Sequence, residues 1–236
     1  MYKIHEMKKM LTALFTVFLF NSCDVLQQLP VSGGVTEAEA GQGIKQALDK
    51  GLNRAVSQLN STDGFFKNEL YKILLPPEAK KIENTFRTLG LGSLVDKAVL
   101  SINRGAEDAV GKALPIFTDA IKAMTLQDAL GIVRGGDTSI THYFREKTTN
   151  KLYTAFMPVI QSSLDKVSAT RYYGDLIQQY NDFPTTIKKL NPDLADYVTS
   201  RTTDAMFKVI AVEEKNIREN PVARTTEILK KVFGGI

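Results

Sequence analysis

Charged residues at helical spacing are the groups in this chain that could bind a polar ligand or carry out a reaction. Glu213 follows Ile210 by three residues and Val209 by four, which places its carboxylate on the apolar side of a predicted helix. A carboxylate in that position needs a basic partner, and Arg224 is a candidate. Further candidates for the same partly buried ionic network are Arg104, Asp108 and Arg145.

Two interpretations of this network remain open. The charges are either salt bridges that fix the packing of helix ends or the lining of a polar site. An enzyme predicts charged groups that converge in an open cleft with opposed pKa shifts, whereas a packing role predicts closed pairs that satisfy one another. A binding module predicts an apolar cavity or an exposed apolar patch.

A second polar cluster follows the Gly135-Gly136 break and consists of Asp137, Thr138, Ser139 and Thr141. Asp137 or Thr138 is expected to cap the helix that begins there, because such side chains accept hydrogen bonds from free backbone amides. The alternative is a polar pocket that holds an anion at the helix N-terminus. The carboxylate of Asp137 argues against it, since it would repel a second anion.

Several kinds of chemistry are excluded by counting. The chain has two histidines, His5 and His142, and His5 lies in a segment that we expect to be removed. Metal sites with two histidines are therefore excluded, and no phosphate loop, calcium loop or Gly-x-Ser-x-Gly motif occurs. We expect no metal and no cofactor.

The N-terminus predicts export. Lysines precede an apolar run from Leu11 to Phe20, which is too short to span a bilayer and is typical of a signal peptide, with Met1 or Met7 as its start. Cys23, the single cysteine, follows directly, and Leu-Phe-Asn-Ser-Cys resembles the lipobox of bacterial lipoproteins. We therefore expect a signal peptide at residues 1–22, membrane attachment through lipidated Cys23, and a flexible tether at residues 23–35.

Charge gives no reason to expect nucleic-acid binding. The chain has 30 basic and 26 acidic residues, and removing residues 1–22 takes away three lysines and Glu6. The remaining 27 basic and 25 acidic residues give a net charge of +2. A nucleic-acid-binding protein would concentrate many more positive charges on one face.

Helices must position all of these groups. No stretch alternates with period two for six residues, so we predict an all-α fold: an irregular bundle of about eight to ten helices in a single domain at residues 36–236. Thr36 and Glu39 form a capping box, as do Thr125 and Asp128. Caps, glycines and prolines place the helices at about residues 36–60, 77–90, 93–115, 115–124, 125–135, 138–167, 171–183, 191–219 and 221–234.

Several motifs occur together in one order. They are Thr-Asp-Gly-Phe-Phe at 62–66, Leu-Pro-Pro-Glu at 75–78, Asn-Arg-Gly-Ala at 103–106, the central motif at 125–138, Asn-Pro-Asp-Leu at 191–194 and the terminal motif at 220–234. In this combination the chain resembles the bacterial family DUF 4197 over about residues 36–234. The resemblance implies an exported helical protein, often a lipoprotein, and no activity that can be assigned to a residue.

The sequence thus favours an envelope lipoprotein that acts as a non-catalytic helical binding or assembly module. Its partner would be a small apolar ligand or another envelope protein. The alternative is an envelope enzyme that needs no cofactor and uses a cleft of carboxylate and arginine groups.

Overall fold

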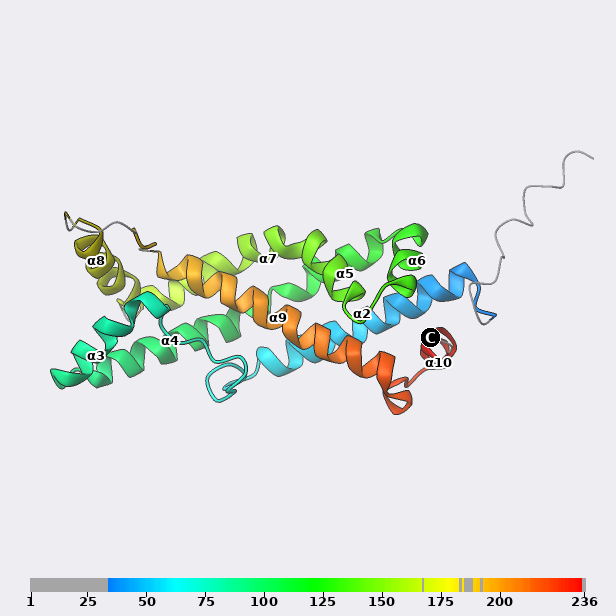
Figure 1. Cartoon of the computed structure of the whole chain (residues 1–236), viewed down its shortest axis with the longest axis horizontal. Coiled ribbons are helices and arrows are strands. Elements are labelled where there is room, and N and C mark those ends of the chain that lie inside the picture. Colours follow the sequence, from blue (N-terminus) through cyan, green and yellow to red (C-terminus); the bar gives the residue numbers. More distant parts are fainter. Residues whose placement is uncertain (1–33, 167, 183, 185–188, 192, 235–236) are drawn as a thin grey trace, which may run out of the picture.

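Helices joined by short connections make up the structure, a computed structural model that describes residues 34–166, 168–182, 184, 189–191 and 193–234 (Figure 1). Cys23, the signal peptide predicted at residues 1–22 and the tether up to residue 33 lie outside the described residues.

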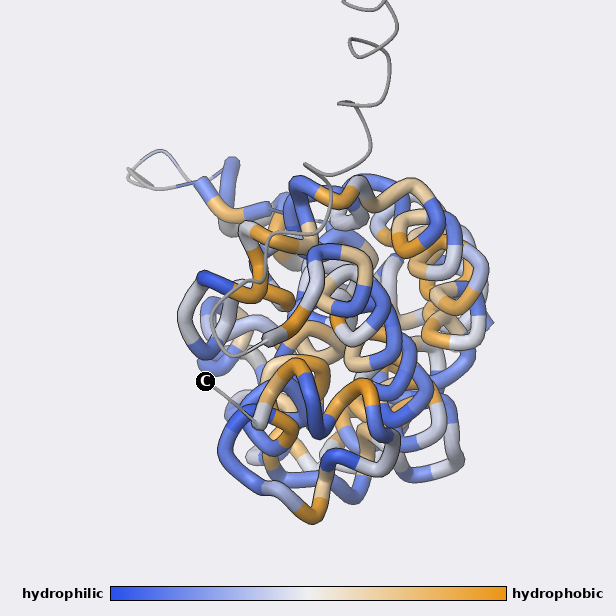
Figure 2. Tube along the Cα trace, turned by 90° about the vertical axis from the view of Figure 1, so that its right-hand side faces the viewer, coloured by the Kyte–Doolittle hydropathy of each residue, from blue (hydrophilic) through white to orange (hydrophobic). Residues whose placement is uncertain are grey.

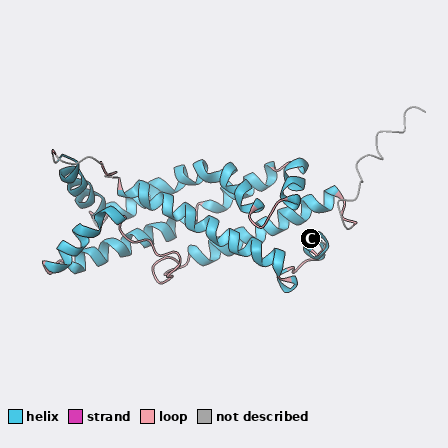
Figure 3. Ribbon diagram, in the orientation of Figure 1, coloured by secondary structure: helices cyan, strands magenta, loops and turns pink. Residues whose placement is uncertain are grey.

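Nine α-helices and two short 3₁₀ turns lie in the described ranges, which contain no strand (Figure 3). The predicted all-α class with eight to ten helices is therefore confirmed. The helices are α2 (Glu37–Leu59), α3 (Lys80–Thr88), α4 (Gly92–Val110), α5 (Ala113–Ala123), α6 (Leu126–Arg134), α7 (Ser139–Asp165), α8 (Ala169–Asp182), α9 (Leu194–Glu219) and α10 (Glu227–Phe233). The 3₁₀ turns are η1 (Pro77–Ala79) and η2 (Pro221–Ala223).

Both predicted capping boxes are formed. Thr36 Oγ1 accepts a hydrogen bond from the Glu39 amide at 3.3 Å, and the Glu39 carboxylate accepts one from the Thr36 amide at 2.9 Å. Lys231 of α10 and then Thr36 lower the pKa of Glu39 to about 2. At the start of α6 the shorter Asp128 makes the same reciprocal bonds with Thr125, at 3.0 and 3.1 Å. Local sequence signals therefore determine where these two helices begin.

Prolines have different effects in two helices. The boundary predicted at Pro115 lies instead at residues 111–112: α4 ends at Val110, and Pro115 is the third residue of α5, where its missing amide has no intrahelical partner. Pro158 lies inside α7, which continues past it to Asp165 as predicted.

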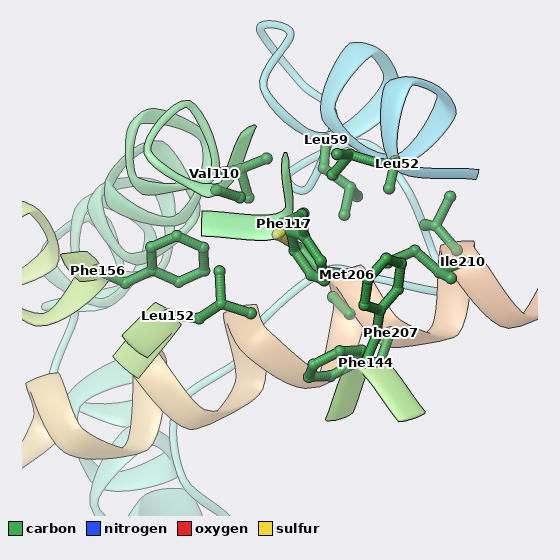
Figure 4. Packing of buried hydrophobic residues seen from close by; sticks show 14 of the residues in the cluster. Leu52, Leu59, Val110, Phe117, Phe144, Leu152, Phe156, Met206, Phe207 and Ile210 are labelled. Carbon is green, nitrogen blue, oxygen red and sulfur yellow. The ribbon is translucent and has the colours of Figure 1, made fainter. Parts of the chain in front are cut away.

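The core lies where α9 packs against both α2 and α7, while α4 runs along α7 (Figure 1). Three fully buried phenyl rings from α5, α7 and α9 meet there (Figure 4). The ring of Phe117 lies edge-on to Phe144 at 5.0 Å and to Phe207 at 6.0 Å between centroids. Such edge-to-face contacts add to the free energy gained by burying the rings.

The bundle is elongated. The α3–α4 turn and α8 lie at one end of its long axis, and α6, α10 and the start of α2 lie at the other (Figure 1). Viewed along that axis, hydrophilic and hydrophobic residues alternate around the helices (Figure 2). None of the helices in the described ranges combines the length and apolarity needed to cross a membrane.

Two glycines, Gly41 and Gly43, lie near the start of the first helix. The structure begins α2 at Glu37 and keeps both Gly41 and Gly43 within it. A Cβ atom at Gly43 would lie 2.6 Å from Val232 Cγ2 of α10. The glycine thus allows a side chain of α10 to approach the backbone of α2, which explains why a residue with low helix propensity is found there.

Substituting Gly43 with alanine is therefore expected to destabilise the protein by up to about 2 kcal/mol, because overpacking costs about 1–3 kcal/mol and the gain in helix propensity offsets about 1 kcal/mol of it. Gly131 in α6 is the matched control, since no atom lies within 4 Å of a Cβ built there. Gly131→Ala should stabilise the protein by about 0.5–1 kcal/mol. Urea denaturation followed by circular dichroism measures both changes. Equal signs for the two variants would contradict the proposed close packing at Gly43.

Candidate functional site

Glu214 of α9 is a carboxylate buried in the core, with 3% of the residue exposed. Its Oε1 accepts a hydrogen bond from the Ile140 amide at 3.0 Å, and its Oε2 accepts from the amide and the hydroxyl of Thr141 at 2.9 and 2.8 Å. These are amides of the first turn of α7, which have no partner inside their own helix. A side chain 73 residues away in sequence therefore caps α7.

Arg218, one turn after Glu214, neutralises this buried carboxylate. Its Nε donates to Glu214 Oε1 at 3.1 Å, and its terminal nitrogen donates to Ser139 Oγ at 2.8 Å. The guanidinium also lies 5.5 Å from the ring centroid of Phe233 in α10. We call this group, Glu214, Arg218, Ser139, Ile140 and Thr141, the α7 clamp. Since its charges are paired and enclosed, the α7 clamp holds the corner between α6 and α7 in place.

The polar residues predicted after Gly136 have different positions. Thr138 occupies the N-cap position of α7, but its side chain makes no capping hydrogen bond, and both Asp137 and Thr138 are exposed. Glu214 supplies the cap instead, because its two carboxylate oxygens satisfy two amides at once. Thr141 is buried and belongs to the clamp.

Glu213 and Arg224 do not pair with each other. Glu213 forms a salt bridge with Lys50 of α2 at 3.2 Å. Arg224 donates to the carbonyl oxygens of Ile217 and Arg218 at 2.9 and 2.6 Å, and so closes the C-terminal end of α9. The apolar face predicted for α9 is the buried one, and Glu214, between Ile210 and Ile217, is its enclosed carboxylate.

A second buried carboxylate, Glu107 of α4, holds the loop after α2. The residue is 3% exposed, and its Oε1 accepts from the amides of Phe65 and Phe66 at 3.1 and 3.3 Å. Arg104 donates to Glu107 Oε2 at 2.5 Å and to Asp63 Oδ1 at 2.7 Å. Together these residues form the loop clamp.

Electrostatics and backbone shape reinforce the loop clamp. Glu107 and then Asp63 raise the pKa of Arg104, while Lys67 and then Arg104 lower the pKa of Asp63. Asp63 has φ of +67°, a conformation that Asp tolerates better than most residues. A Cβ atom at Gly64 would lie 2.4 Å from the carbonyl oxygen of Gln58, so only glycine fits there.

Asn103, one turn before Glu107, fixes the next part of the same connection. This side chain is fully buried, accepts from the Ile73 amide at 2.9 Å and donates to the Ile73 carbonyl at 2.8 Å. It thereby replaces the pairing that a neighbouring strand would offer to an extended segment. No role was predicted from the sequence for Asn103, Glu107, Glu214 or Arg218. Their signal is a polar residue on an apolar helical face with a charged or amide residue three or four positions away.

The other predicted charges lie apart from both clamps. Asp108 is exposed. Arg145 pairs with Asp204 of α9 at 2.7 Å, and its guanidinium lies 4.6 Å from the ring centroid of Phe207. Arg104 is the member of the predicted set that joins the loop clamp, and Thr141 joins the α7 clamp. The residues of the predicted network therefore take part in several separate contacts and do not come together at one site.

A hollow of about 370 Å³ lies between residues 70–77, the start of α3 and one side of α9. Its charged lining includes four cations, Lys72, Lys80, Arg201 and Lys208. Its two acids, Glu83 and Asp204, pair with Arg87 at 3.0 Å and Arg145 at 2.7 Å. We call this hollow the basic groove.

The basic groove also has apolar and aromatic walls. Leu70 and Leu74 line it and are 78% and 56% exposed. Tyr71 and Tyr197 line it as well, and burial raises the pKa of Tyr71. The guanidinium of Arg201 lies 5.3 Å from the ring centroid of Tyr197. This arrangement offers positive charge next to apolar surface.

Neither of the two buried glutamates lines the basic groove. Each accepts hydrogen bonds from backbone amides and from an arginine. His142 is exposed on α7. No group of three or more His, Cys, Asp or Glu side chains suited to a metal ion occurs among the described residues.

By its fold and these sites, the protein is an all-α bundle in which buried carboxylates hold the loops in position and an open groove carries positive charge. The chain belongs to the DUF4197 family, described as proteins of unknown function, which matches residues 34–234. The resemblance of the sequence motifs to that family is thus confirmed. No curated protein and no solved structure matches the chain.

Proposed function

We propose that this chain is a lipid-anchored, non-catalytic binding module of the bacterial cell envelope, with the basic groove as its binding site. The anchoring part of the proposal rests on the apolar run from Leu11 to Phe20 and on Cys23 directly after it. Between Cys23 and Thr36 the chain can extend by about 3.3–3.6 Å per residue, so the bundle can stand some distance from the bilayer.

The contrast between enclosed and open charges carries the binding part of the proposal. The buried carboxylates of the two clamps are satisfied by backbone amides and arginines, as expected of groups that fix packing. In the basic groove, by comparison, the cations face an open hollow whose size suits a small molecule. These features favour a binding module over an enzyme that uses a carboxylate and arginine cleft.

Native mass spectrometry of the protein extracted from its own membrane tests the proposal. We expect a mature chain that begins at Cys23 and carries acyl chains, together with a non-covalently bound small molecule. The Cys23→Ala variant should lose both the acyl mass and the cleavage before residue 23. A chain that keeps residues 1–22 and carries no bound molecule would contradict the proposal.

A further inference from the structure

We propose that the basic groove binds an anionic amphiphile, a small molecule with a phosphate or carboxylate head and a hydrocarbon segment. This inference rests on the proposed function, since it names the class of ligand for the same groove.

The charges of the groove indicate the head group. Its four cations come from two segments far apart in sequence, Lys72 and Lys80 on one side and Arg201 and Lys208 on the other. Within the described part of the chain, none of the four forms a salt bridge. The two acids in the lining are paired with arginines. A concave surface with unneutralised positive charge concentrates anions.

Arg201 is suited to hold such a head group. Its guanidinium lies over Tyr197, which limits the orientations of the side chain. A planar guanidinium presents paired donors that match the oxygens of a phosphate or carboxylate. The lysines nearby add positive charge without requiring one geometry, so the groove does not by itself distinguish the two head groups.

The leucines of residues 70–74 indicate the hydrocarbon part. Tyr71 and Ile73 are buried, while Leu70, Lys72 and Leu74 are exposed, and all five residues line the groove. Lys72 therefore lies, in sequence, between two exposed leucines of the groove lining. An apolar side chain this exposed gains free energy when a ligand covers it.

The wall of the groove is held in position before a ligand arrives. Asn103 binds both backbone groups of Ile73, and the loop clamp fixes Phe65 and Phe66 upstream. The ammonium of Lys72 lies 4.4 Å from the ring centroid of Phe66. Because these contacts order the segment in the free protein, binding does not require a large loss of conformational entropy.

Size favours a small molecule over a segment of a protein. The hollow of about 370 Å³ falls in the range of small-ligand sites, about 300–1,000 Å³. A stable complex with a protein partner would bury about 800 Å² of the surface of this chain. An acidic peptide is therefore included as a competing probe in the test.

The test compares octyl phosphate, inorganic phosphate, octyl glucoside and an acidic hexapeptide. Calorimetric titrations use the lipid-anchored protein in phosphatidylcholine nanodiscs, with empty nanodiscs as the blank. We expect octyl phosphate to bind at least ten-fold more tightly than any of the other three probes. Nonanoate, which carries a carboxylate on an octyl chain, then allows the carboxylate and phosphate head groups to be compared.

Variants assign the binding to the groove. Lys72→Gln with Lys208→Gln should weaken octyl phosphate at least ten-fold, whereas Lys97→Gln with Lys151→Gln, two exposed lysines outside the groove, should change it less than two-fold. Leu70→Ser with Leu74→Ser should remove the advantage of octyl phosphate over inorganic phosphate.

Several results would overturn the inference. Equal binding of octyl glucoside would remove the need for charge, equal binding of inorganic phosphate would remove the need for the hydrocarbon, and tighter binding of the peptide would indicate a protein partner. Equal losses in the groove and control variants would place the site elsewhere. If the membrane extract retains a neutral or cationic small molecule, this inference fails while the proposed function stands.

Discussion

Replacing Glu214 with alanine is expected to lower the free energy of unfolding by about 3–5 kcal/mol, the usual cost of breaking a buried ion pair from one side. The truncation leaves the enclosed guanidinium of Arg218 without its carboxylate. It also leaves the amides of Ile140 and Thr141 without an acceptor, in a part of the core that water does not reach. Urea denaturation followed by circular dichroism at 222 nm is the measurement.

Glu219→Ala is the matched control, because Glu219 lies on the same helix and forms an exposed pair with Lys215 at 3.7 Å. Its effect should stay within about 0.5 kcal/mol. Glu214→Gln keeps the shape and one acceptor oxygen, so it separates the loss of charge from the loss of volume. A change below 1 kcal/mol for Glu214→Ala would show that the α7 clamp does not stabilise the corner.

The sequence was sufficient for the elements whose signals are local. The capping boxes at Thr36 and Thr125 begin helices where predicted, because both partners of each box lie within one turn. The double glycine at 135–136 likewise coincides with the break between α6 and α7, whereas the break before α5 lies at residues 111–112, ahead of Pro115. The absence of period-two alternation was enough to predict the all-α class.

The residues that hold these elements together could not be predicted in the same way. A helical pattern defines the centre of an apolar face only to within about one residue, and adjacent residues point about 100° apart. That error is sufficient to exchange Glu213, whose side chain is 12% exposed, for the buried Glu214. Their partners come from other helices, and no local pattern shows which amide a distant carboxylate will meet.

The two clamps follow one physical rule. In each, a buried glutamate accepts two consecutive backbone amides from a distant segment, and an arginine on the same helix neutralises it, three residues before Glu107 or four after Glu214. Backbone amides at a bend cannot all be satisfied by helix hydrogen bonds. Charged side chains in this core therefore determine where the chain bends.

Truncating Glu107 to alanine should have an effect comparable to that of Glu214→Ala, about 3–5 kcal/mol, because the amides of Phe65 and Phe66 and one side of Arg104 lose a buried acceptor. Asp108→Ala provides an exposed control one residue away, with an expected change within about 0.5 kcal/mol. Hydrogen exchange should show faster exchange at the Phe65 and Phe66 amides in the Glu107 variant. Unchanged protection of these amides would contradict the loop clamp, since Glu107 is the acceptor that the structure gives to both.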